Sequence, residues 1–133
     1  MHPLFVYGTF REGESNRTVI EPFVAGSRPA RLPGAVLYYV DPYPMVADGD
    51  GSVVGELITL PANSYTEALA ALDHFEGYDP ATDTGAYRRR LREVIALDTG
   101  ERVTAWVYLG DPETVEGHPV VPSGDWCRRS FLE

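Results

Sequence analysis

Glu76 is the residue whose type and spacing point most directly to chemistry. The segment NSYTEALAALDHFEG, residues 63–77, repeats apolar side chains at helical spacing. The residues near one face of this expected helix are Tyr65, Leu69, Leu72 and Phe75. Because Glu76 follows Leu69 by seven positions and Leu72 by four, it projects from the middle of that face. Desolvation there would raise the pKa of the carboxyl group toward neutrality, where a general acid or base works best.

The helical spacing also leaves a purely structural interpretation of Glu76 open. The residue stands at the end of the helix, where fraying would turn its side chain outward, and the arginines within residues 88–92 offer an ion-pair partner. Glu67 and Asp73 are expected on the opposite, solvated face. Helix geometry alone therefore makes an acid/base role a hypothesis.

A second candidate site is the segment LFVYGTFREGESNR, residues 4–17, in which an apolar strand breaks at Gly8. Glycine lets a backbone or a ligand approach closely, and consecutive N–H groups in a turn can bind an anion. The alternative is an ordinary loop in which the Thr9 hydroxyl caps local backbone. We expect the turn to hold a carboxylate or a developing oxyanion.

The composition excludes several classes of mechanism. The chain has 133 residues and a formal net charge of −9, and its 11 basic residues are all arginine. Without lysine there is no Schiff-base nucleophile, no pyridoxal-phosphate anchor and no Walker-A lysine. No G-x-S-x-G motif is present, and the acidic balance argues against nucleic acid as the partner.

Cysteine and histidine usage points to a cytoplasmic protein without a metal. A lone cysteine, Cys127, cannot form an internal disulfide and fits a reducing compartment. No apolar run approaches the ~20 residues that span a bilayer, and no signal peptide is recognisable, so no membrane association is expected. The three histidines are scattered, and neither a metal nor another cofactor is expected.

The pattern of elements predicts an α+β fold in a single domain, residues 1–133, with a strongly curved or closed sheet. The expected strands are Leu4–Tyr7, Ala35–Val40, Val53–Leu60, Tyr87–Leu97 and Val103–Leu109, with a hairpin loop at 98–102. Ser64 with Glu67 forms a potential capping box, and Gly77 is placed to end the main helix. A short helix is expected around Arg17–Phe23, and loops at 41–52 and 110–124.

Three stretches in order, VYGTFREGESNR, LDHFEGYDPATDTGAYRRR and VVPSGDW, resemble the γ-glutamylcyclotransferase-like family, which includes γ-glutamylamine cyclotransferases and AIG2-like proteins. The resemblance implies a small mixed β-barrel with flanking helices and a central cavity. It also implies that the protein releases an amine from a small-molecule γ-glutamyl substrate. The substrate's own α-amine would attack, leaving 5-oxoproline.

The resemblance assigns roles residue by residue. The catalytic glutamate of the family's LDxxEG motif falls on Glu76. The substrate-binding YG(T/S)L motif falls on Tyr7, Gly8, Thr9 and Phe10, with Phe10 in place of the usual leucine. Tyr87 falls on a Y-x-R position and is expected either to contact substrate or orient Glu76, or to pack in the core. Tyr43 matches a YP turn and is expected to cover the barrel.

Three functions compete on this basis. The leading one is a γ-glutamylcyclotransferase acting on a γ-glutamyl amine or a γ-glutamyl amino acid. The alternative is a non-catalytic module that binds a small anionic metabolite in the same pocket, and an ionisable Glu76 on the apolar face argues against it. A third interpretation is an interaction scaffold with an acidic surface, which predicts no particular function for the turn at residues 7–10. A monomer is favoured.

Overall fold

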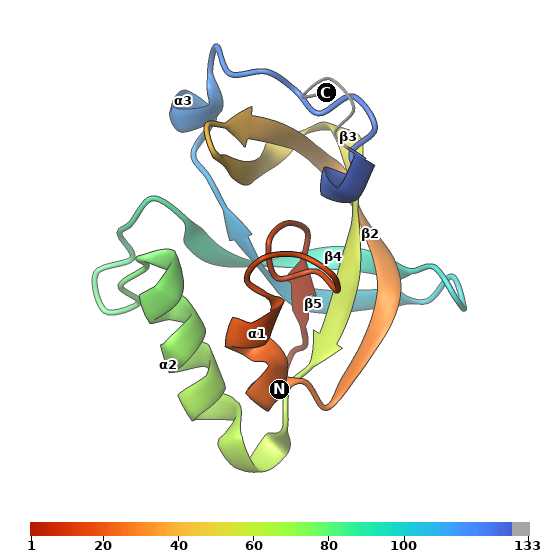
Figure 1. Ribbon diagram of the computed structural model, residues 1–133, viewed down its shortest axis with the longest axis vertical. Helices are drawn as coiled ribbons and strands as arrows, with labels where there is room; N and C mark the ends of the chain where they lie inside the picture. Colours follow the sequence, from red (N-terminus) through yellow and green to blue (C-terminus); the bar gives the residue numbers. More distant parts are fainter. Residues whose placement is uncertain (129–133) are drawn as a thin grey trace.

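Five strands form a closed barrel in the computed structural model, which describes residues 1–128 (Figure 1). The strands are β1 (Leu4–Val6), β2 (Gly26–Val40), β3 (Tyr43–Thr59), β4 (Arg88–Ala96) and β5 (Arg102–Leu109). They pair in the order β1-β3-β2-β4-β5 and are antiparallel, except that β5 joins β1 in parallel and closes the barrel. The predicted mixed barrel with flanking helices is confirmed.

The helices lie outside the barrel. The predicted 17–23 helix is present as α1 (Arg17–Ile20) followed by the 3₁₀ turn η1 (Glu21–Phe23). The main helix, α2 (Tyr65–Glu76), follows the 3₁₀ turn η2 (Ala62–Ser64). The predicted loop at 110–124 contains the short helix α3 (Pro112–Val115), and η3 (Trp126–Arg128) comes after it. None of the described helices is long and apolar enough to cross a membrane.

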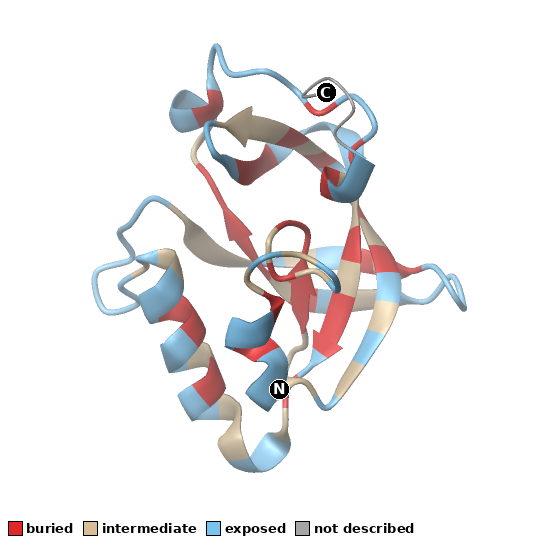
Figure 2. Cartoon of the chain, in the orientation of Figure 1, coloured by how far each residue is buried: buried red, intermediate tan, exposed pale blue. Residues whose placement is uncertain are grey.

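Strand β1 belongs to two apolar cores, because its side chains alternate between the two faces of the sheet. Phe5 points into the barrel interior, where it packs with residues of β2, β3, β4 and β5. Leu4 and Val6 point outward and pack with Ala68 and Leu72 of α2. Figure 2 shows buried residues along the barrel strands and on one side of α2. This double anchoring fixes the end of β1, from which the turn at residues 7–10 begins.

The prediction of a loop at residues 41–52 is wrong, because β2 and β3 form one long hairpin. Their ladder runs from the pair Gly26–Thr59 to the pair Val40–Tyr43, with an irregularity between Pro33 and Ala35. Proline, glycine and aspartate in both strands resemble turn signals. The ladder nevertheless continues on both sides of the irregularity, which leaves Gly34 and residues 49–51 without a partner, and the burial of residues 45–47 adds to the pairing.

Two predictions about α2 are wrong and one is confirmed. Ser64 is at the N-cap position, but its side chain makes no capping hydrogen bond, so the capping box with Glu67 does not form. Asp73 was expected in solvent and is buried, because α2 packs against charged and aromatic residues of β4 and β5. Gly77 ends the helix in the left-handed conformation, with φ of 70°, as predicted.

Candidate active site

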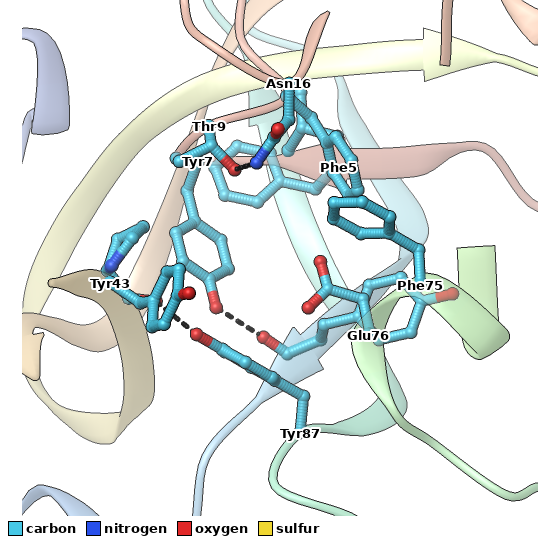
Figure 3. Close-up of a pocket in the computed structure, with 13 residues that line it drawn as sticks. Phe5, Tyr7, Thr9, Asn16, Tyr43, Phe75, Glu76 and Tyr87 are labelled. Atoms are coloured by element: carbon cyan, nitrogen blue, oxygen red, sulfur yellow. Dashed lines mark hydrogen bonds between the residues drawn. The ribbon is translucent and has the colours of Figure 1, made fainter. Parts of the chain in front are cut away.

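A cavity of about 490 Å³ lies between the end of β1, the end of α2 and the barrel wall (Figure 3). All six residues predicted for the site contribute to its lining: Tyr7, Gly8, Thr9, Phe10, Glu76 and Tyr87. They come from segments nearly 80 positions apart in the chain. The fold therefore brings the turn after β1 and the end of α2 to one cavity. Their catalytic and binding roles remain predictions.

Glu76 is the one charged residue among the described residues that line the cavity. Its carboxylate points into the cavity (Figure 3) and has neither a hydrogen bond nor an ion pair with a described residue. Burial raises the pKa of Glu76 from its ordinary value of 4.5 to about 7. At neutral pH both the acid and the base form are therefore populated.

The arginines that could have paired with Glu76 are engaged elsewhere. Each of the four in β4 makes an ion pair with an aspartate, in the pairs Arg88–Asp111, Arg89–Asp73, Arg90–Asp83 and Arg92–Asp48. The N–H of Tyr78 donates to the Asp73 carbonyl at 2.8 Å, and that of Gly77 donates to the His74 carbonyl at 3.2 Å. These two bonds close the helix end around Glu76 and oppose the fraying that would turn it outward.

In the turn at residues 8–10, the described residues provide partners for the carbonyl groups but not for the N–H groups. The Gly8 carbonyl accepts a hydrogen bond from the N–H of Arg11 at 3.0 Å, and the Thr9 carbonyl accepts one from the N–H of Asn16 at 2.9 Å. The Phe10 carbonyl accepts one from Nη1 of Arg17 at 3.4 Å. None of the three N–H groups of the turn has an acceptor among the described residues. Such a segment is suited to bind an anion.

Gly8 is needed for packing against β3. A Cβ at this position would collide with the side chain of Pro44. The Pro44 carbonyl in turn accepts a hydrogen bond from the Tyr87 hydroxyl at 2.8 Å. The close approach that we expected at Gly8 is therefore made by a neighbouring strand, which holds the turn against the cavity wall.

The two predicted tyrosines donate their hydroxyl protons to backbone carbonyls, not to Glu76. Tyr7 donates to the Tyr108 carbonyl at 2.7 Å, and Tyr87 donates to Pro44. Burial raises the pKa of both phenols, so they are neutral around the carboxylate. Their hydrogen bonds orient the cavity wall.

Several lining residues were missed from the sequence. Asn16 donates its side-chain amide to the Thr9 hydroxyl at 3.0 Å, so that hydroxyl orients a neighbour across the turn. Phe75 stands at the rim with 45% of its surface exposed and packs on Phe10, with ring centroids 5.3 Å apart. Tyr43, which we expected to cover the barrel, is 58% exposed at the same rim. The polar stretch after Gly8 was the available signal for Asn16.

Comparisons with known proteins identify the family to which the chain belongs. The sequence profile described as gamma-glutamyl cyclotransferase, AIG2-like, matches residues 4–128. A candidate gamma-glutamylcyclotransferase of Vibrio cholerae is 36% identical over 128 residues, which are 96% of this chain and 97% of that protein. The gamma-L-glutamyl-butirosin B gamma-glutamyl cyclotransferase of Niallia circulans is 30% identical over 109 residues, covering 82% of this chain and 67% of that enzyme.

The fold matches as well. The crystal structure of an AIG2-like protein from Mus musculus superposes with a TM-score of 0.64 at 25% identity, covering 90% of this chain and 86% of that one. With a profile match over nearly its whole length, the chain belongs to the gamma-glutamyl cyclotransferase, AIG2-like family. The family resemblance found in the sequence is thereby confirmed.

Glu76→Gln should stabilise the protein above neutral pH. Because the pKa of Glu76 is higher in the folded chain, folding takes up protons, and stability falls as pH rises from about 4.5 through 7. The variant lacks this loss, so its advantage over wild type should grow between pH 4 and pH 8 by up to about 3 kcal/mol. Urea denaturation at both pH values measures it.

Glu67→Gln is the matched control, because Glu67 is exposed on the same helix. Its effect on the free energy of unfolding should be the same at both pH values. A Glu76→Gln effect that is equally independent of pH would contradict the assignment of a desolvated carboxylate.

Proposed function

We propose that this protein is a γ-glutamylcyclotransferase that forms 5-oxoproline from a γ-glutamyl conjugate, with Glu76 as general acid and base. The main support is that a carboxyl group with a pKa of about 7 faces the same cavity as a turn with three unpaired N–H groups. A positioned acid/base needs a pKa near the working pH. Acyl transfer also needs hydrogen-bond donors beside the carbonyl oxygen on which negative charge develops.

The proposed reaction needs no protein nucleophile, because the substrate carries its own. Glu76 takes a proton from the α-ammonium group, and the freed amine attacks the γ-carbonyl carbon to close a five-membered ring. The bond from that carbon to the leaving nitrogen then breaks while Glu76 returns a proton to this nitrogen. After the attack the ring nitrogen loses a second proton, which Glu76 passes to the released amine. The α-nitrogen thus loses two protons and the leaving nitrogen gains two, and Glu76 returns to its initial ionised state.

The turn at residues 8–10 is proposed to bind an anion of the substrate, either the α-carboxylate or the developing oxyanion. No arginine lines the cavity among the described residues, so an anion would be bound by uncharged donors, and the backbone N–H groups of the turn have no acceptor among the described residues. Tyr7 and Tyr87 would form the wall against which the glutamyl chain folds.

The second candidate, a non-catalytic module for a small anionic metabolite, has weaker support. Such a module would gain from the N–H groups of the turn but would place its ligand in the same cavity as Glu76. Above pH 7 that carboxylate is mostly ionised and repels an anion. In the proposed enzyme, by contrast, the Glu76 carboxylate has a function as the group that accepts and donates protons.

The chain should form 5-oxoproline from at least some members of a panel of γ-glutamyl amines and γ-glutamyl dipeptides. Glu76→Gln should lower kcat by at least ~10²-fold with folding preserved, because shape is kept and proton transfer is lost. Chromatography of 5-oxoproline measures both. Glu67→Gln, on the exposed face of α2, should keep wild-type activity.

Acetylation of the substrate's α-amine separates the candidates. The acetylated conjugate lacks the nucleophile and should remain intact, whereas a hydrolase using water would still cleave it to a glutamate product. A binding module would turn over neither compound. Full activity of Glu76→Gln, or cleavage of the acetylated conjugate, would refute the mechanism.

The rim of the cavity supports a leaving amine without a carboxylate of its own. Its exposed residues are the aromatic Tyr43 and Phe75, and the described lining contains no basic side chain. The protein carries a net charge of −9, so a second anionic group on the substrate would face an unfavourable field. An apolar or aromatic amine would pack on the two rings.

Two conjugates with the same aromatic ring test this selectivity. γ-Glutamyl phenethylamine should be turned over with a kcat/KM at least about tenfold above that of γ-glutamyl phenylalanine, which differs by one carboxylate. Tyr43→Arg should narrow the gap by supplying a cation at the rim. Equal kcat/KM values for the two conjugates would overturn the proposed selectivity and leave the reaction type untouched.

We also propose a reducing compartment such as the cytoplasm. The support is the single cysteine, Cys127, for which no internal disulfide partner exists. With this acidic balance the partner is expected to be a small molecule and not a nucleic acid.

A further inference from the structure

Asp73 is a buried carboxylate for which the proposed reaction has no use. It lies in the last turn of α2, three residues before Glu76, and 4% of its surface is exposed. Burying a carboxylate is costly unless it is paired and hydrogen-bonded. Its place in the helix that carries the proposed acid/base calls for an explanation.

The Asp73 carboxylate joins α2 to two strands of the barrel. From β4, the Arg89 side chain donates twice, from Nε to Oδ1 at 2.8 Å and from Nη2 to Oδ2 at 3.0 Å. From β5, the Tyr108 hydroxyl donates to Oδ1 at 2.7 Å. Two-pronged arginine pairs fix direction as well as distance, so the three elements are held in one arrangement.

The cation of this cluster is held in turn by an aromatic ring. The Arg89 guanidinium carbon lies 4.2 Å from the centroid of the Trp106 ring, which belongs to β5. Such stacking adds to the ion pair and restricts the arginine side chain. The carboxylate of Asp73 therefore binds to a preorganised partner.

The same cluster reaches the cavity along two routes. The backbone carbonyl of Tyr108 accepts the Tyr7 hydroxyl, and Tyr7, Tyr108 and Glu76 all line the cavity. The backbone carbonyl of Asp73 accepts the Tyr78 N–H, which ends the helix two residues after Glu76. Both the side chain and the main chain of Asp73 thus determine where the last turn of α2 points.

We propose that Asp73 is a positioning residue that, through Arg89 and Tyr108, holds the carboxylate of Glu76 directed into the cavity. This role rests on the proposed function of Glu76. The pair Asp73–Arg89 is electrically balanced, so it holds the helix end without adding net charge beside the cavity. The other titratable groups in the described lining are phenols, and burial raises the pKa of those of Tyr7, Tyr87 and Tyr108, so these three are neutral.

Asp73→Asn tests the proposal by kinetics and pH dependence. The change should lower kcat at least about tenfold with a smaller effect on KM, because a misdirected carboxylate transfers protons poorly. It also leaves the Arg89 cation without its counter-charge. That cation should stabilise the Glu76 anion and move the acid limb of kcat/KM down by about half a pH unit or more.

Asp83→Asn is a closely matched control. Asp83 also accepts two bonds from an arginine, Arg90, and one from a tyrosine hydroxyl, that of Tyr78, but it is exposed. Its φ of 54° is one that asparagine adopts readily. This variant should keep the wild-type kcat, KM and pH profile.

Tyr108→Phe covers the case in which Asp73→Asn does not fold. It removes one bond to Asp73 but keeps the ring in the cavity wall and the ion pair intact, so kcat should fall by about threefold or more with the acid limb unmoved. If wild type forms 5-oxoproline while Asp73→Asn, corrected for its folded fraction, keeps both kcat and the acid limb, Asp73 is merely structural. A Tyr108→Phe variant with wild-type kcat refutes the role equally. Absence of 5-oxoproline with wild type instead refutes the proposed function, and the positioning role with it.

Discussion

An ionisable carboxylate that faces a cavity without an ionic partner among the described residues is the constraint on which the site depends. Glu76 has a pKa of about 7 because burial disfavours its charged form and no described cation compensates. The ionised Glu76 lowers the free energy of unfolding at neutral pH. Other interactions offset this loss, namely the packing of β1 in two cores and the hydrogen bonds of Asp73. Strongly shifted pKa values of this kind cluster at functional sites.

The charge distribution of the chain keeps that cavity free of cations. The chain contains no lysine, and all four arginines of β4 form ion pairs with aspartates from other parts of the chain. Arginine stays protonated and prefers two-pronged carboxylate partners, and the pairs of Arg89, Arg90 and Arg92 have this geometry. The described lining therefore offers an anion only uncharged donors, among them the backbone N–H groups of the turn at residues 8–10.

Helical periodicity was sufficient to place Glu76 on the apolar face of the helix, and the family resemblance supplied its proposed catalytic role. Glycine chemistry was sufficient to end the helix at Gly77. Helical periodicity failed for Asp73. It assigns a charged residue to solvent because it contains no information about an ion-pair partner on a strand that is distant in the sequence. The hairpin at 41–52 was missed because its ladder is non-local and overrides turn-forming residues. The polar stretch after Gly8 was a signal for Asn16, and helical spacing placed Phe75 on the apolar face, but that either residue lines the cavity depends on tertiary packing.

The most direct test of the account is the titration of the Glu76 carboxyl group itself. Carboxyl-¹³C NMR of glutamate-labelled wild-type protein, with the Glu76→Gln spectrum to assign the resonance, reports its protonation across pH. The account predicts a midpoint near 7, well above the ordinary 4.5 of a glutamate. A midpoint near 4.5 would show that the carboxylate is solvated or paired, and would contradict the role assigned to it.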